Sequence, residues 1–147
     1  MQKKEEVLNN NQDPLITYFF VNKNLNMSGG KLGVQTARAG QVMLLNELKK
    51  EDTLLLDSLN ELFVGAKMEG NKSICLKANE NQLNRLLSGD LYEKIQDISV
   101  NNDVPIRLYS VHDVGHTEVE PNSLTVVVMT PVPQSIIQPI TKKFNLY

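Results

Sequence analysis

The chain has 147 residues, of which 41% are hydrophobic and 22% are charged. These values are typical of one globular domain that buries its own core, and they exclude a disordered or disulfide-stapled chain. The formal net charge of −2 and the pI near 5.7 exclude a bulk nucleic-acid binder, so any contact with nucleic acid must rest on a local basic patch.

The single cysteine and the absence of targeting signals indicate the compartment. Cys75 lies between Ile74 and Leu76 and is interpreted as a small buried hydrophobic residue rather than a nucleophile. No segment is long and apolar enough to cross a bilayer, and no basic stretch followed by an apolar one opens the chain. We therefore expect a protein of the reducing cytoplasm that makes no membrane contact.

The N-terminal part predicts a tail followed by a strand. Residues 1–13 combine charges with asparagines and have little to bury, which favours a mobile tail before a domain of residues 14–147. Leu15–Val21 is rich in aromatic and β-branched residues, which favour a strand. Gly29 and Gly30 then precede a helical pattern. Such glycines let backbone N–H groups gather at a helix start, where the helix dipole attracts an anion.

The helical pattern extends from Lys31 to about Lys49. Lys31, Gln35 and Arg38 recur at i, i+4 and i+7, so they lie on one polar stripe. Taken alone, Lys31 is more simply a solvated lysine and Arg38 a surface ion pair. The residues expected to pack on the sheet are the apolar ones at roughly helical spacing, namely Val34, Ala37, Leu44, Leu45 and Leu48.

The remaining segments alternate between helix and strand. In order, we expect a helix at 53–66, a strand at Ser73–Lys77, a helix from Asn79 to about Leu87, a helical turn or two at 91–98, a strand at 106–111, a strand ending near Met129, and a helix from Gln134 to about Phe144 that Pro139 bends or breaks. This alternation predicts an α/β layered domain.

The loop between the last two predicted strands concentrates ionisable side chains. Gly115 supplies the backbone freedom that turns Asp113 and Thr117 toward one point. Taken alone, the loop is more simply a solvated connection with an Asx turn at Asp113. His112, Asp113 and His116 also suggest a metal site. This spacing lacks the usual register of ligand pairs and the chain has no third histidine, so a metal is the weaker interpretation.

Three stretches of the chain resemble the archaeal and eukaryotic type of peptidyl-tRNA hydrolase. They are Phe20–Gln35, which contains Met27-Ser28-Gly29-Gly30-Lys31, then Asp113–Pro121, and then Thr125–Pro133. The family typically shows Met-Gly-x-Gly-Lys, then Ala-Gln-x-x-His-Ala, and later Arg-Asp-Ala-Gly-Arg-Thr before a proline. The order and spacing of these motifs fit from about Leu15 to Tyr147.

The resemblance implies a single three-layer α/β domain, with a mixed four-stranded sheet and helices on both faces. It also implies hydrolysis of the ester between a peptide and the 3′-terminal ribose of tRNA, without a metal or an organic cofactor. Lys31, Asp113 and Thr117 match the family's functional lysine, aspartate and threonine, and Gln35 matches its glutamine. For such an ester, Lys31 can hold a phosphate or stabilise the oxyanion, Asp113 can orient or deprotonate a water, and Thr117 can hydrogen-bond that water or the ribose.

Several positions depart from the family pattern. Asn22 and Asn24 stand where the family has arginine and aspartate, Arg38 replaces a histidine, and His112 and His116 replace two arginines. Neutral histidine carries no charge near pH 7, so Asn22, Arg38, His112 and His116 predict a weaker or altered hold on tRNA. The alternatives are a non-enzymatic tRNA- or protein-binding module on the same fold, or a homologue that cleaves a different ester. The sequence leaves the formation of a homodimer open.

Overall fold

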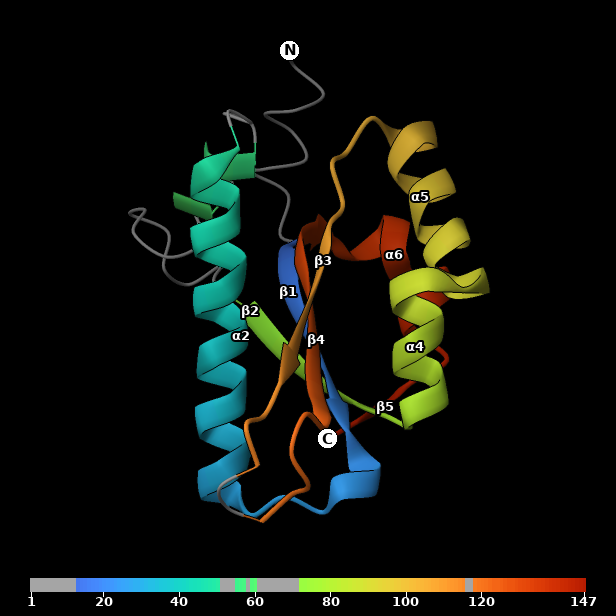
Figure 1. Cartoon of the computed structure of the whole chain (residues 1–147). Helices are drawn as coiled ribbons and strands as arrows, with labels where there is room; N and C mark the ends of the chain where they lie inside the picture. The colour runs from blue at the N-terminus through green and yellow to red at the C-terminus, as the bar shows by residue number, and fades with distance from the viewer. Residues whose placement is uncertain (1–12, 51–54, 58, 61–71, 116–117) are drawn as a thin grey trace.

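The computed structural model describes residues 13–50, 55–57, 59–60, 72–115 and 118–147 (Figure 1). Its elements are β1 (Leu15–Asn22), the 3-10 helix η1 (Lys23–Leu25), α2 (Gly29–Lys49), β2 (Lys72–Ala78), α4 (Glu80–Ser88), α5 (Asp90–Asn102), β3 (Leu108–His112), β4 (Leu124–Pro133), α6 (Gln134–Thr141) and β5 (Asn145–Leu146). Strands and helices alternate, so the predicted α/β class is confirmed.

The strands form one mixed sheet in the order β3-β4-β1-β2-β5. β1 is parallel to β2 and antiparallel to β4, and β4 is antiparallel to β3. The sheet has five strands rather than the four expected. β5 pairs Leu146 with Leu76 and Asn145 with Lys77, and a strand of two residues is too short to show the alternation by which strands are predicted.

Helices cover both faces of the sheet, with α2 on one face and α4, α5 and α6 on the other (Figure 1). Leucines and isoleucines of α4, α5 and α6 pack with β1 and β4 in one hydrophobic core, while Ala39 and Met43 of α2 pack with Val126 and Val128 in a second. β4 lies between the two cores, and its residues are buried up to Val132. The expected three layers follow from this arrangement.

The apolar stripe predicted for α2 does not face the sheet. Its residues Val34, Leu45 and Leu48 are 62%, 59% and 59% exposed. The buried face consists instead of Gln35, Ala39, Met43 and Glu47, which recur every four residues. Buried polar side chains persist where they find partners. Gln35 has such a partner in Thr125 of β4, and Glu47 has one in Tyr109 of β3. Hydrophobic periodicity cannot detect such partners, so it selected the wrong face.

Other helices follow their sequence signals more closely. Asn79 caps α4 and exchanges hydrogen bonds with Gln82 in a capping box. α5 continues to Asn102, beyond the expected turn or two, and α6 ends at Thr141, two residues after Pro139. Most of the helix expected at 53–66 and all of residues 1–12 lie outside the described residues. Asp13, assigned to the tail, accepts hydrogen bonds from the backbone and hydroxyl of Ser135 at 2.8 Å each.

Two further expectations concern the environment of the chain. Cys75 is partly buried, and this burial raises the pKa of its thiol, which fits a packing role rather than a nucleophile. Within the described part of the chain, no helix has both the length and the hydrophobicity that a bilayer crossing requires.

Candidate active site

The candidate site forms where the first turn of α2 meets the residue that follows β3. The Nζ atom of Lys31 lies 2.9 Å from Oδ2 of Asp113. Ser28 fixes the start of α2 as its N-cap, because its Oγ accepts a hydrogen bond from the Lys31 N–H. Asp113 is held from the other side, where its N–H donates to the carbonyl of Ser123 at 2.9 Å. The two charges therefore meet because each belongs to a fixed element.

Asp113 is a buried carboxylate with three donors around it. It is 3% exposed. Its Oδ2 also accepts from the Gly115 N–H at 2.8 Å, and its Oδ1 accepts from Nε2 of Gln35 at 3.1 Å. Lys31 lowers the pKa of Asp113 most, burial opposes this, and the Gly115 N–H and the charge of Arg38 lower it further. Asp113 is therefore ionised at neutral pH.

Gln35 of α2 is oriented by Thr125 of strand β4. Its side-chain oxygen accepts a hydrogen bond from Oγ1 of Thr125 at 2.7 Å, which directs the amide nitrogen toward Asp113. Both Gln35 and Thr125 are almost fully buried. No sequence pattern singles out Thr125, because threonine favours strands and β4 contains a second threonine, Thr130. A bulge in β4 beside Thr125 is visible only in the strand register.

Gly115 allows the loop to close over Asp113. Its φ is +80°, in the region that favours glycine, and a Cβ there would lie 2.4 Å from Cα and N of Pro121. The Asn122 N–H donates to the carbonyl of Asp113 at 2.7 Å. This positive φ is the backbone freedom that the sequence predicts at Gly115. Thr117, which Gly115 was also expected to turn toward the site, lies outside the described residues.

Glu118 supplies an anion beside the start of α2. Its carboxylate accepts from the Ser28 hydroxyl at 2.6 Å and from the Ser28 N–H at 3.1 Å. These two bonds lower the pKa of Glu118, the hydroxyl most. The anion that the sequence predicts near this helix start is therefore matched by a side chain of the protein itself.

The other candidate residues lie in different settings. Asn22 is 2% exposed; its Nδ2 donates to the carbonyl of Leu124 at 2.9 Å, and its oxygen accepts from the Asn24 N–H. It thus ties the end of β1 to the start of β4. Arg38 and His112 are exposed. His116 and Thr117, which the sequence also assigns to the site, lie outside the described residues.

The described residues include no group of three histidines, cysteines or acids suited to a metal ion. His116, which the weaker metal interpretation included, lies outside the described residues.

The arrangement is suited to attack by water on an ester. An ionised carboxylate has about four acceptor positions, and three donors occupy them in Asp113. The remaining position, on Oδ1, can accept a hydrogen bond from a water. The ammonium group of Lys31, which contacts Oδ2 of the same carboxylate, is a positive charge of the kind that stabilises an oxyanion during attack.

Comparison with known proteins decides the family. Residues 15–147 match the family model described as Peptidyl-tRNA hydrolase PTH2. The chain belongs to this family. Proteins named peptidyl-tRNA hydrolase from Methanococcus vannielii and Methanococcus maripaludis are each 27% identical to it over 126 residues, which is 86% of this chain and 93% of the relative. One from Saccharolobus islandicus is 25% identical over the same shares. The resemblance identified in the sequence is thus confirmed over nearly the whole domain.

Proposed function

We propose that the chain hydrolyses the ester between a peptide, or an N-blocked aminoacyl group, and the 3′-terminal ribose of tRNA. The observation that carries this proposal is the ion pair of Lys31 and Asp113 at 2.9 Å, in a chain that matches the peptidyl-tRNA hydrolase family from residue 15 to residue 147. The named relatives from archaea support the same activity.

In the proposed reaction, a water oxygen attacks the ester carbonyl carbon. Asp113 accepts a hydrogen bond from this water and orients it, and it takes the proton as the new C–O bond forms. Lys31 stabilises the negative charge on the carbonyl oxygen. The bond to the ribose oxygen then breaks, and the proton held by Asp113 passes to that oxygen. A free ribose hydroxyl and a peptide carboxylic acid result, and the acid becomes the carboxylate by releasing its proton to solvent. Gln35 acts as a positioning residue, because it holds Asp113 and is held by Thr125.

Four further residues are proposed to contact the substrate, and a fifth to shape the site. Thr117 is proposed to hydrogen-bond the water or the ribose, as the family resemblance implies. Arg38 and His112 are exposed near the site and are proposed to contact the tRNA, together with His116. Asn22 is buried at the end of β1, so its proposed contribution is to shape the site from beneath.

The decisive experiment follows release of the acyl group from an N-acetyl-aminoacyl-tRNA. The parent chain is compared with Asp113→Asn, and Asp103→Asn serves as a control because Asp103 is an exposed residue at the end of α5. We expect turnover by the parent and the control, and a rate lower by roughly 10²–10⁴ in Asp113→Asn. No turnover by the parent with tRNA binding retained would select the non-enzymatic alternative.

We further propose that two copies of the chain associate through the exposed face of α2. The large apolar side chains on this face are Val34, Leu44, Leu45 and Leu48, which are 62%, 42%, 59% and 59% exposed. The only acid in α2, Glu47, is buried, so the face carries no negative charge.

Sedimentation velocity tests this association. Leu45→Glu places a charge in the middle of the proposed interface, and Val100→Glu places one at a position that is 79% exposed on α5. We expect the parent and Val100→Glu to sediment as dimers and Leu45→Glu as a monomer. A monomeric parent would contradict the dimer and leave the hydrolase proposal intact.

The domain boundary and the compartment complete the proposal. We propose that residues 14–147 form the catalytic domain and that 1–12 are dispensable for activity, whereas Asp13 supports α6, which lacks a side-chain cap of its own. Losing such a cap costs about 1 kcal/mol, so Asp13→Ala should lower the free energy of unfolding and deletion of 1–12 should not. The proposed substrate arises in translation, which supports a cytoplasmic location.

A further inference from the structure

Strand β3 has one edge that no other described strand pairs with. Its only described neighbour is β4. The Thr130 N–H donates to the carbonyl of Arg107, and the Asp113 N–H donates to the carbonyl of Ser123, each at 2.9 Å. Backbone groups of successive residues in a strand point to opposite sides. The odd-numbered residues therefore bond toward β4.

It follows that the N–H and C=O groups of Leu108, Ser110 and His112 point away from β4. The register between β3 and β4 is continuous from Leu108 to Val111, and its bulge lies in β4, so the alternation along β3 is not interrupted. A free edge of this kind is a template for one more strand.

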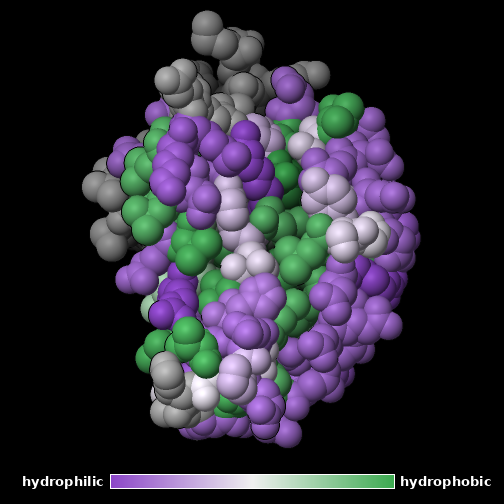
Figure 2. Space-filling view, in the orientation of Figure 1, coloured by the Kyte–Doolittle hydropathy of each residue, from purple (hydrophilic) through white to green (hydrophobic). Residues whose placement is uncertain are grey.

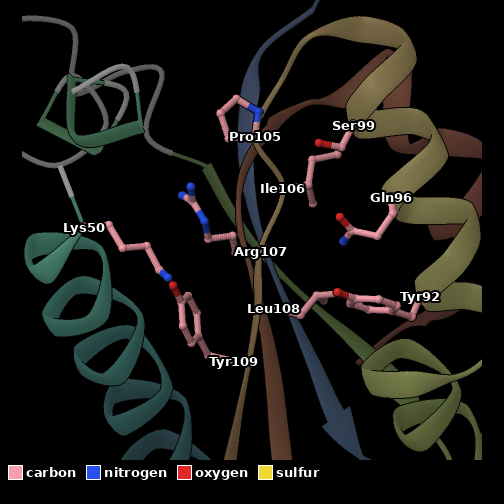
Figure 3. Close-up of a pocket in the computed structure, with 9 residues that line it drawn as sticks. All are labelled: Lys50, Tyr92, Gln96, Ser99, Pro105, Ile106, Arg107, Leu108 and Tyr109. Carbon is pink, nitrogen blue, oxygen red and sulfur yellow. The ribbon is translucent and has the colours of Figure 1, made fainter. Parts of the chain in front are cut away.

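The free edge lies at the bottom of a groove. Nine residues line a hollow of about 450 Å³: Lys50, Tyr92, Gln96, Ser99, Pro105, Ile106, Arg107, Leu108 and Tyr109. Figure 3 shows the side chains of α5 on one side of β3, and Lys50 with Tyr109 on the other. Figure 2 shows apolar side chains at the surface between α2 and the helices opposite. The groove is therefore open to solvent, and its lining combines apolar side chains with the polar ones of Lys50, Gln96, Ser99 and Arg107.

One wall of the groove is rigid. Glu47 is fully buried and accepts a hydrogen bond from the Tyr109 hydroxyl. It also forms an ion pair with Arg107, whose Nη1 lies 2.8 Å from the carboxylate. This environment raises the pKa of Tyr109, through burial first and then through Glu47, so the phenol stays protonated. The aromatic wall is thus held in place before anything binds.

The free edge of β3 runs from this groove to the candidate active site. β3 ends at His112, and the next residue is Asp113. The five residue steps from Leu108 to Asp113 span roughly 17 Å of extended chain. The edge and the reactive carboxylate therefore lie on one line.

We propose that the peptide half of peptidyl-tRNA binds along this edge as an added strand, an inference that rests on the proposed hydrolase function. The ester carbonyl belongs to the last residue of the peptide and must lie at Asp113, at the C-terminal end of β3. The bound peptide therefore runs parallel to β3, with its earlier residues toward Leu108 and Tyr92. Strand addition recognises the main chain, so peptides of different sequence are accepted.

The chemistry of the groove favours a peptide over the RNA half of the substrate. Among the lining residues Lys50 and Arg107 are the cations, and Arg107 is paired with Glu47. Binding of nucleic acid depends on several unscreened cations along the backbone. Backbone groups that no described strand pairs with, flanked by apolar and uncharged polar side chains, suit an extended peptide instead.

The test compares two substrates that share their tRNA and their last residue. One carries a single N-acetylated residue, and the other carries an N-acetylated hexapeptide long enough to reach Leu108. We expect kcat/KM to be about tenfold higher for the hexapeptide, the effect of one or two net backbone hydrogen bonds.

Ser110→Pro removes an outward N–H of β3 without touching the bonds to β4, and proline is tolerated at such edge positions. Ser110→Ala keeps the N–H and is the matched control. We expect Ser110→Pro to lose the preference for the hexapeptide while it hydrolyses the short substrate as the parent does. Ser110→Ala should keep the preference.

Modified substrates test the same contact in the parent chain, should the proline variant fail to fold. A hexapeptide N-methylated at the alternate amides that face β3 should fall to the kcat/KM of the short substrate, and methylation of the other amides should change little.

Equal kcat/KM for the long and short substrates would overturn the strand-addition inference alone. Hydrolysis of neither would overturn the proposed function and this inference together. A parent dimer that Ser110→Pro converts to a monomer, with the peptide preference unchanged, would assign the edge to a second copy and also overturn it.

Discussion

The ammonium of Lys31 and the carboxylate of Asp113 lie 2.9 Å apart, which joins the first turn of α2 to the loop that follows β3. This pair sets the ionisation of the site, because Lys31 is the largest cause of the lowered pKa of Asp113. Asp113 must be ionised both to orient the water and to take its proton, so Lys31 widens the pH range in which Asp113 can act.

The first prediction concerns the pH dependence of Lys31→Met. Activity requires ionised Asp113, so in the parent it falls only when the pH drops below the lowered pKa of that carboxyl. Without Lys31 the pKa rises, and burial then raises it further. We expect the acid limb of the kcat profile to move to higher pH in Lys31→Met and to return toward the parent's position in Lys31→Arg. A lower rate with an unmoved acid limb would show that Lys31 does not set the ionisation of Asp113.

Much of the fold follows from local sequence signals. Asn79 and Gln82 predict the start of α4, and the unbroken apolar run of β4 predicts a strand covered on both faces. The buried face of α2 does not follow in this way. It depends on Gln35 and Glu47, which are buried because partners from β3, β4 and the Asp113 loop meet them. Such partners are distant in sequence, so a local pattern cannot predict them.

The candidate site also combines residues that the sequence predicts with contacts that it does not. Family motifs predict that Lys31, Gln35 and Asp113 are functional residues, and the structure brings these three together. The role of Thr125 as the residue that orients Gln35, and the contact of Glu118 with Ser28, depend on a strand bulge and a loop closure. Gly115 signals the turn of the loop but not the contact of Glu118 with Ser28, and the bulge has no signature in the residues that form it.

A second prediction concerns Gly115→Ala. The φ of +80° disfavours any side chain, and the added Cβ would meet the backbone of Pro121 at 2.4 Å. The atoms that this Cβ would meet belong to the backbone of Pro121, so they cannot move aside as a side chain could. The loop must therefore shift, and the Gly115 N–H then no longer donates to Asp113. We expect a free energy of unfolding lower by at least about 1 kcal/mol and a lower kcat. Gly33→Ala is the control, because its Cβ would meet nothing within 4 Å and alanine favours a helix. A Gly115→Ala variant as stable and as active as the parent would contradict this account of the loop.

A third prediction concerns Glu118→Gln and stability at low pH. The pKa of Glu118 is lowered in the folded chain, so its contribution is fully present above the ordinary pKa of glutamate and is lost as the pH falls through the lowered one. We expect the parent to have the higher Tm near neutral pH, and the difference from Glu118→Gln to shrink steadily in acid. Glu120→Gln is the control, since Glu120 is also an exposed glutamate of this loop. A Tm difference that is constant with pH would show that the charge of Glu118 is irrelevant to its contact with Ser28.

The last prediction concerns tRNA binding by Arg38. This side chain is exposed on α2, and its charge reaches Asp113 closely enough to lower the pKa of that carboxyl. The phosphates next to the scissile ester should therefore lie within its reach. Binding to phosphate releases counterions, so the logarithm of affinity falls with the logarithm of salt by about 0.7 for each single-strand phosphate. We expect Arg38→Gln to weaken tRNA binding and to reduce this slope by about 0.7, as measured by filter binding across a salt series.

Lys142→Gln removes an equal charge at the exposed end of α6, on the opposite layer of the domain, and should leave the slope unchanged. Equal slopes in the parent and Arg38→Gln would mean that the tRNA does not contact this part of α2. The cations that hold it would then lie elsewhere, although the ion pair of Lys31 and Asp113 would keep its proposed role in hydrolysis.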